Sequence, residues 1–293
     1  MTETEELMDA LCTTYERTAP TRDLGYVVKQ HHNFHTKGMA RANYLITTSQ
    51  FQSWLTDRDS NILLVDGHCG EESTGRIAPT SILCAGLIEA LSNPSIDSAL
   101  AFPDCPRTML HFFAGQHVMP NNTLRGPYGL IRSLVDQLLF NWPDQNNLPD
   151  LRFLEGEPSK WVSEHGSQTT NLCRLFERLV LQLRSDSSIY CIIDGVSYFE
   201  TQLQGWADDL GTIVECFLRC IDGTRGYKGA CAVKFLLVSA DKSTRIWNRI
   251  PSSHHVDLRA GNLHAQSRVE DALATGIMEA GYQEEPRRGH MGF

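Results

Sequence analysis

The residues best placed to do chemistry form a loop that follows a short apolar run. The run covers residues 62–65, and the loop reads Gly67-His68-Cys69-Gly70-Glu71-Glu72-Ser73-Thr74. A glycine-rich loop after a buried strand can turn its backbone N–H groups toward the phosphates of a nucleotide. A working loop of this kind has the pattern Gly-x-x-x-x-Gly-Lys-Ser/Thr, in which the lysine reaches the outer phosphates and the hydroxyl helps to hold Mg²⁺.

This loop keeps only part of that pattern. Gly67, Gly70 and Thr74 are of suitable type, but Glu72 stands at the position of the second glycine and Ser73 at that of the lysine. Two unit charges about 4 Å apart interact by roughly 4 kcal/mol at an effective dielectric of about 20. Carboxylates in the loop therefore disfavour a triphosphate, and we predict that the phosphate site is vestigial.

The nearest candidate for the missing cation is Arg76. No lysine occurs between Lys37 and Lys160, so a small shift of the alignment does not restore the charge. To serve the loop, Arg76 would have to reach back past a bend at Gly75.

Other candidate sites have simpler structural interpretations. Cys69 could be a nucleophile, but the Cys-x5-Arg pattern needs arginine at the position of Gly75, and we interpret Cys69 as a structural loop residue. The cluster of His31, His32 and His35 could bind zinc, but it has no Cys partner nearby and is interpreted as packed or solvated.

Two further groups are also interpreted structurally. Cys216 and Cys220 are four positions apart on a predicted helix, a spacing that suits a metal, but Phe217 and Ile221 favour a buried helix face. A locally basic region is interpreted as a solvated rim and consists of Lys228, Lys234, Lys242 and Arg245.

Buried strands must position these residues. Short apolar runs suited to strands buried on both faces lie at 62–65, 109–114, 189–193 and 235–238, with a weaker one at 254–258. Helical patterns lie between them at 79–91, 129–140, 171–183 and 211–221. This alternation predicts an α/β fold with a doubly wound parallel sheet of about five strands, preceded by N-terminal helices.

We predict three segments along the chain. Residues 1–45 hold a helix to about residue 18 and then a polar, irregular stretch from 19 to 45. Residues 46–260 form the sheet domain, which opens with a short helix at 48–55. Residues 261–293 are polar, with a helix at 267–279 and a tail. The long connection at 141–168 contains three prolines and is predicted to wrap the surface and carry binding contacts.

The composition narrows the class of function. Apolar residues make up 41% of the 293 residues, and the net charge is −9, which argues against a general nucleic-acid binder. The chain has no run of about 18 apolar residues, as a membrane-spanning helix needs, and its acidic start lacks a signal peptide. Nine scattered cysteines, an odd number, indicate reduced thiols and a cytoplasmic location.

Four segments in order resemble the NACHT-type, STAND-class P-loop NTPases of filamentous fungi, the group with a nephrocystin-3-like N-terminal domain. The segments are Phe51-Gln52-Ser53-Trp54-Leu55, the strand and loop at 61–70, the strand ending in Asp194-Gly195, and the strand at 233–239. The helix pattern at 126–139 also resembles one of that family. The resemblance covers about residues 45–258 and implies an ATP and Mg²⁺ site, with Asp194 helping to hold the ion.

The chain departs from this family at three places. Besides the loop, the acidic pair expected after Asp194 is replaced by Ser197 and Tyr198, and Glu200 could substitute only if the strand end is extended. The sensor arginine expected after Ser239 is replaced by Ala240 and Asp241.

Departures at three separate parts of the nucleotide site predict that ATP hydrolysis has been lost. We therefore expect a catalytically degenerate domain that acts as an interaction, scaffold or regulatory module, without a cofactor. Its partners would be proteins, among them related NACHT-type proteins, and neither nucleic acid nor membrane. The alternative is a divergent ATPase that binds ATP and Mg²⁺ weakly and uses Arg76, Thr74, Asp194 and Glu200. A third alternative is a truncated gene product without a selected function.

Overall fold

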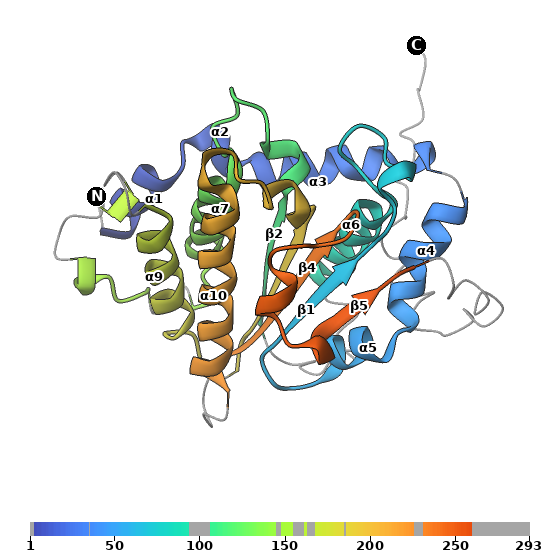
Figure 1. The fold of residues 1–293 in the computed structure, drawn as a ribbon. Helices are drawn as coiled ribbons and strands as arrows, with labels where there is room; N and C mark the ends of the chain where they lie inside the picture. Colours follow the sequence, from blue (N-terminus) through green and yellow to red (C-terminus); the bar gives the residue numbers. More distant parts are fainter. Residues whose placement is uncertain are drawn as a thin grey trace, which may run out of the picture.

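The computed structural model describes residues 3–34, 36–93, 106–144, 148–154, 161–162, 168–184, 186–225 and 231–259. Within these ranges five strands form one parallel sheet in the order β2-β3-β4-β1-β5 (Figure 1). The strands are β1 (Asn61–Asp66), β2 (Arg107–Phe113), β3 (Ser188–Asp194), β4 (Ala232–Ser239) and β5 (His255–Asp257). The predicted doubly wound parallel sheet is thereby confirmed.

The strand order places the candidate residues at one edge of the sheet. β1 lies between β4 and β5, so the chain leaves β1 toward the far edge at β2 and later returns from β4 to the other side of β1. Open parallel sheets bind ligands outside the carboxyl ends of their strands, at such a reversal of the strand order. Asp66, Asp194 and Ser239 end three adjacent strands there.

Alternation along the strands divides the interior into two hydrophobic cores. Ile62 and Leu64 belong to one core, and Leu63 and Val65 to the other, because successive side chains of a strand point to opposite faces. The first core is covered by α7 (Gly126–Phe140), α9 (Gln168–Val180) and α10 (Trp206–Thr224), together with the first N-terminal helix (Figure 1). The second core is covered by α6 (Pro79–Ser92) and by later helices of the N-terminal part. Burial on both faces explains the continuous apolar runs of the strands.

The N-terminal part is more helical than we predicted. Its helices are α1 (Glu3–Leu11), α2 (Thr14–Arg17), α3 (Ala19–Lys29), α4 (Thr36–Thr47) and α5 (Ser49–Thr56). The prediction of an irregular stretch at 19–45 was wrong, because Gly25, Gly38 and the few apolar positions lower the intrinsic helix propensity. Packing of Val27 and Leu45 into the second core stabilises α3 and α4 instead.

The predicted first helix is interrupted at Thr13. The Thr13 side chain accepts from the N–H of Glu16, and the Glu16 carboxylate accepts from the N–H of Thr13, which makes a capping box that starts α2. Glu16 also pairs with Arg132 of α7 at 2.7 Å, and Arg17 pairs with Asp136 at 3.1 Å. These ion pairs fasten the N-terminal helices to the sheet domain.

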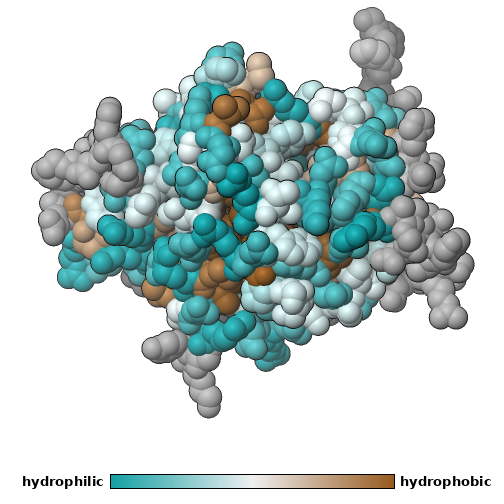
Figure 2. Space-filling model, in the orientation of Figure 1, coloured by the Kyte–Doolittle hydropathy of each residue, from teal (hydrophilic) through white to brown (hydrophobic). Residues whose placement is uncertain are grey.

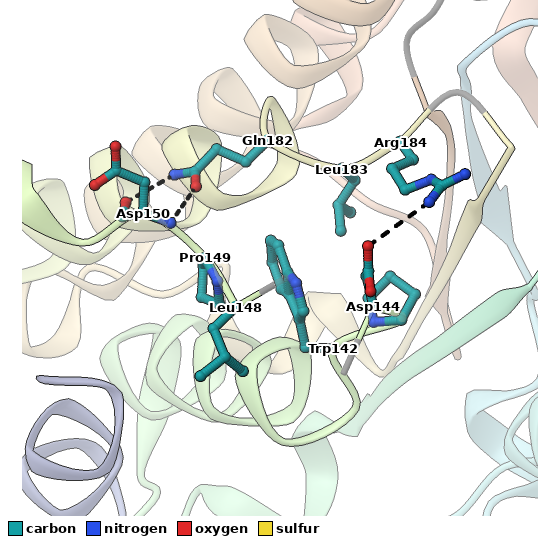
Figure 3. A pocket seen from close by; sticks show the side chains of 9 residues that line it. Trp142, Asp144, Leu148, Pro149, Asp150, Gln182, Leu183 and Arg184 are labelled. Carbon is teal, nitrogen blue, oxygen red and sulfur yellow. Dashed lines mark hydrogen bonds and ion pairs between the residues drawn. The ribbon is translucent and has the colours of Figure 1, made fainter. Parts of the chain in front are cut away.

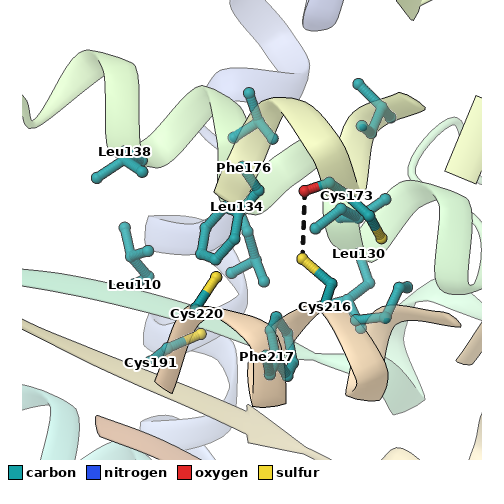
Figure 4. Close-up of a cluster of buried hydrophobic side chains, with 14 of the residues drawn as sticks. Leu110, Leu130, Leu134, Leu138, Cys173, Phe176, Cys191, Cys216, Phe217 and Cys220 are labelled. Carbon is teal, nitrogen blue, oxygen red and sulfur yellow. Dashed lines mark hydrogen bonds between the residues drawn. The ribbon is translucent and has the colours of Figure 1, made fainter. Parts of the chain in front are cut away.

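Four cysteines lie together in the first core (Figure 4). Cys173 lies on α9, Cys191 on β3, and Cys216 and Cys220 on α10, all buried beside Phe176 and Phe217. The Cys216 thiol donates to the backbone oxygen of Cys173 at 3.2 Å. The buried-face interpretation of Cys216 and Cys220 is confirmed, and these thiols serve as small apolar groups.

Lys234 departs from the predicted solvated rim. It lies in the central strand β4 and is 0% exposed, and the ammonium Nζ has no hydrogen-bond partner. Burial lowers the pKa of Lys234 to about 8, against the attraction of Asp57 and Asp59. The prediction was wrong because the apolar run was placed at 235–238, just after Lys234, whereas β4 begins at Ala232 and includes the lysine.

The connection between α7 and α9 is tied to the end of α9. The backbone of Asp150 and the side-chain amide of Gln182 exchange two hydrogen bonds of 2.6 and 3.1 Å. Arg184 lies 3.7 Å from Asp144, and Trp142 packs between them and Leu148 beside a cavity of about 220 Å³ (Figure 3). The described part of this connection lies only partly on the surface, because Trp142, Leu151 and Leu154 are buried in the first core whereas Asp150 and Arg152 are exposed.

On the face drawn in Figure 2, apolar side chains are exposed as separate small patches among hydrophilic ones. Within the described ranges, no helix is long and apolar enough to cross a membrane. His35, Lys228 and the predicted helix at 267–279 lie outside the described residues.

Candidate functional site

The loop at residues 67–78 connects β1 to α6 at the carboxyl end of the sheet. It contains a short 3-10 helix at Gly70–Glu72 and a tight turn in which Thr74 and Ile77 exchange backbone hydrogen bonds of 2.9 and 3.2 Å. Helix α6 begins only at Pro79, as the proline in its first turn predicts. The aligned phosphate-loop residues thus precede the helix, and they do not open it.

The backbone donors at the start of the loop already have partners. The N–H of Gly67 donates to the oxygen of Ser239 at 2.9 Å, and the N–H of Cys69 donates to that of Ala240 at 2.7 Å. These bonds extend the pairing of β1 with β4 beyond the strand ends. A side chain at Gly67 would lie 2.8 Å from the Ser239 oxygen, so the close approach of the two segments requires glycine there.

The third donor of the loop binds a carboxylate from the same chain. The N–H of Gly70 donates to Oδ1 of Asp241 at 3.0 Å. A β-carbon built on Gly70 would lie 2.2 Å from Asp241, which shows how closely this carboxylate lies against the loop. Asp241 thus takes the kind of N–H group that a phosphate oxygen would use.

Arg41 of α4 brings a cation to the loop that sequence reasoning missed. Its guanidinium, 8% exposed with the rest of the residue, donates to the backbone oxygen of His68 and lies 3.5 Å from the Glu72 carboxylate. Arg76, the predicted rescue, instead donates to the sulfur of Met119 at 3.2 Å on the exposed surface. No signal in the sequence linked Arg41 to the loop, because its segment was predicted to be irregular.

Replacing Arg41 with alanine should destabilise the protein by about 2 kcal/mol, because the change leaves the His68 oxygen and the Glu72 carboxylate without their charged donor. Urea unfolding measures this change. Arg58→Ala, at an exposed position, is the matched control and should stay within about 0.5 kcal/mol of the wild type. Equal stabilities of the two variants would contradict the bridging role of Arg41.

Asp194, the predicted Mg²⁺ ligand, ends β3 and is 4% exposed. Burial raises its pKa from 3.8 to about 7, although hydrogen bonds from the Ser81 side chain and the Gly195 backbone oppose the rise. Its Oδ1 has no hydrogen-bond partner. Ser81, in the first turn of α6, also accepts from the N–H of Ala78 at 3.0 Å.

The hydroxyl beside Asp194 is therefore that of Ser81 and not that of Thr74. Alignment by spacing alone assigned this role to Thr74, which the structure places in the turn before α6. The Ser81 hydroxyl and the unpartnered Oδ1 of Asp194 are oxygen ligands of the type that a hard cation such as Mg²⁺ prefers. The raised pKa works against this fit, because a protonated carboxyl is a poor ligand.

Glu200 has a structural task. Its carboxylate accepts from the Ser243 hydroxyl and from the N–H groups of Thr244, Arg245 and Ile246, at 2.7–2.9 Å. Both oxygens are engaged in holding the turn after β4. The predicted substitution of Glu200 for a catalytic acid would require these bonds to break.

His68 and Cys69 do not form a nucleophile pair. The imidazole Nε2 of His68 lies 3.1 Å from Asp257 of β5, and the thiol of Cys69 donates to the Gly67 oxygen at 3.1 Å. Burial raises the pKa of Cys69 to about 12, so the thiol stays protonated at neutral pH. This geometry agrees with the interpretation of Cys69 as a structural residue.

The parallel order β2-β3-β4-β1-β5, with a loop after β1 and an acid after β3, defines a P-loop-like, doubly wound α/β domain. The chain belongs to the family described as nephrocystin 3, N-terminal, whose model matches residues 42–239, more than half of the chain. No curated protein and no solved structure matches the chain.

The two charged residues that contact the loop, Arg41 and Asp241, lie just outside the matched range. Arg41 directly precedes residue 42, and Asp241 follows shortly after residue 239. β5, with Asp257, also lies outside the match. Arg41 and Asp241 therefore lie outside the matched range of the chain.

Proposed function

We propose that this chain is a catalytically degenerate member of its family that acts as an interaction, scaffold or regulatory module, with little or no ATP hydrolysis. The observation that carries the proposal is the state of the loop: the N–H groups of Gly67, Cys69 and Gly70 are bound to the segment 239–241. A nucleotide phosphate would have to displace Asp241 and would then meet the carboxylates of Glu71 and Glu72.

Two further observations support the loss of hydrolysis. Glu200 is held by the turn 243–246, so it is not free to polarise a water. The first turn of α6 carries Pro79, Thr80 and Ser81, so the helix N-terminus offers no cation of its own and lacks one N–H donor.

The resemblance to NACHT-type STAND proteins supports a role in the assembly or regulation of related proteins. A cytoplasmic location is part of the proposal, and it is supported by seven buried cysteines that form no disulfide in the described residues, at positions 12, 69, 84, 173, 191, 216 and 220. The rival is a divergent ATPase, and the observation that favours it is the contact between Asp194 and Ser81.

Titration with a fluorescent ATP analogue and Mg²⁺ separates the two proposals. We expect no saturable binding below about 1 mM for the wild type, which corresponds to less than about 4 kcal/mol of binding free energy. Asp194→Ala tests the remnant site, and Asp222→Ala, at an exposed position of α10, is the control.

Micromolar binding by the wild type and by Asp222→Ala, lost in Asp194→Ala, would refute the degenerate site and support the ATPase. Asp241→Ala adds a third arm, because it frees the Gly70 N–H. If Asp241 is what blocks the loop, this variant should bind the analogue more tightly than the wild type does.

A further inference from the structure

Two carboxylates lie side by side where β1 and β5 end. Asp66 and Asp257 are the last residues of these strands, and the parallel register pairs them directly. Paired residues of neighbouring strands place their side chains on the same face of the sheet, where like charges repel. His68 follows β1 with a positive φ of 49°. One ligand atom from each of the three residues lies within 4.8 Å of the others.

The buried member of this group has an acceptor without a partner. Asp66 is 0% exposed, and its Oδ1 accepts from the N–H of Ser243 at 2.8 Å. Its Oδ2 has no hydrogen-bond partner. A buried carboxylate oxygen is costly to leave unpaired, and a second carboxylate beside it adds to the cost. A cation between Asp66 and Asp257 would remove both costs.

We propose that Asp66, His68 and Asp257 bind one divalent transition-metal ion, with Zn²⁺ as the favoured ion. A neutral imidazole and two carboxylates form a donor set that suits Zn²⁺, whereas Mg²⁺ and Ca²⁺ prefer oxygen ligands alone. Three protein ligands leave the fourth tetrahedral position to a water molecule.

The required movement is small. Ligand atoms about 2.0–2.2 Å from Zn²⁺ in a tetrahedral site lie roughly 3.4 Å apart. The His68 Nε2 is already 3.1 Å from Oδ1 of Asp257. The ligand atoms all lie within 4.8 Å of one another, so the Asp66 carboxylate has to approach the other two ligands by at most about 1.4 Å. Asp66 and His68 flank Gly67 on one short segment, and Asp257 is fixed opposite by strand pairing.

Neighbouring groups orient the ligands and also compete with the ion. The N–H of Ser243 donates to Asp66. Arg259 contacts both oxygens of Asp257: its Nη2 lies 2.6 Å from Oδ2, and its backbone N–H and Nε donate to Oδ1 at 3.1 and 3.0 Å, so Oδ1 is shared between Arg259 and His68. Such outer partners fix ligand geometry in metal sites. The guanidinium of Arg259 is 70% exposed in its side chain, so it can move away from the ion. Arg41 donates to the backbone oxygen of His68 and not to its imidazole.

The test is a competition titration of Zn²⁺ between the full chain and a chromophoric chelator, repeated with Co²⁺, whose visible spectrum reports its ligands. We expect the wild type to bind one ion that His68→Gln and Asp66→Asn each bind at least tenfold more weakly. His32→Gln and Asp208→Asn change the same residue types elsewhere and should bind like the wild type. Asp257→Asn covers the case in which the buried Asp66 variant fails to fold.

Wild-type affinity and an unchanged Co²⁺ spectrum in His68→Gln would overturn the proposal, since the ion would then lie elsewhere. Arg259→Gln removes the competing charge and should tighten Zn²⁺ binding severalfold, and weaker binding in this variant would contradict the arrangement. Asp194→Asn should leave Zn²⁺ affinity unchanged, which distinguishes this site from the remnant Mg²⁺ site. The proposal therefore stands or falls independently of nucleotide binding.

Discussion

Replacing Asp194 with asparagine should make the protein more stable at about pH 8 and leave its stability nearly unchanged at about pH 4. The folded protein holds this carboxyl in a buried position where its pKa is about 7, whereas its ordinary value is 3.8. Between these two values the folded chain binds more protons than the unfolded chain, so stability falls as the pH rises.

The expected gain follows from the size of the shift. A rise from 3.8 to about 7 amounts to about 4 kcal/mol at 1.36 kcal/mol for each pKa unit, and relaxation around the charge reduces this to about 2–4 kcal/mol. Asparagine keeps an oxygen that accepts from Ser81 and carries no charge to desolvate. At pH values above the folded-state pKa of Asp194, Asp194→Asn should show its full gain in stability. At pH values below the unfolded-state pKa, this gain should vanish.

Urea unfolding of both proteins at the two pH values measures the effect. Asp222→Asn, on the exposed face of α10, serves as the control and should show no pH-dependent gain. A loss of stability in Asp194→Asn at about pH 8 would instead mean that the ionised carboxylate has a cationic partner. That result would favour the ATPase alternative.

Glu200→Ala should destabilise the protein by about 3 kcal/mol, the second large effect. Hydrogen bonds to a charged acceptor each contribute about 1.5–3 kcal/mol, reduced here by partial exposure. The change removes the acceptor for the Ser243 hydroxyl and for the N–H groups of residues 244–246. Glu200→Gln keeps one carbonyl acceptor and should lose about half as much.

Glu215→Ala removes an exposed glutamate that pairs with Arg249, and it should cost less than about 1 kcal/mol. The comparison separates a structural carboxylate from a catalytic one. A catalytic acid can be removed with little loss of stability, so a Glu200→Ala protein as stable as Glu215→Ala would refute the anchoring role.

Two charged side chains from distant parts of the chain contact the loop after β1. Arg41 neutralises part of the charge of Glu72, and Asp241 occupies the Gly70 N–H. Asp241 accepts from an N–H group that a phosphate oxygen would use in a phosphate-binding loop. Arg41→Ala is therefore expected to lower the stability of the protein. Asp241→Ala is expected to free the Gly70 N–H and so to strengthen binding of the ATP analogue.

The candidate site shows where motif spacing stops being informative. Matching eight residues to a phosphate loop put Thr74 at the hydroxyl position, whereas the structure puts Ser81 beside Asp194. Loop length is weakly constrained by energy, so extra residues before a helix leave no mark on the local pattern. The start of α6 is set by Pro79 and by the packing of its apolar face.

The sequence by itself determined the strands, most of the helices and the parallel arrangement, because burial on both faces imposes a local pattern of apolar residues. It also determined that a lysine is missing from the loop. Only the tertiary structure decided which charged groups contact the loop, since Arg41 lies 27 positions from His68 and Asp241 lies 171 positions from Gly70. Contacts over such separations depend on how the strands are ordered in the sheet, and no local spacing encodes that order.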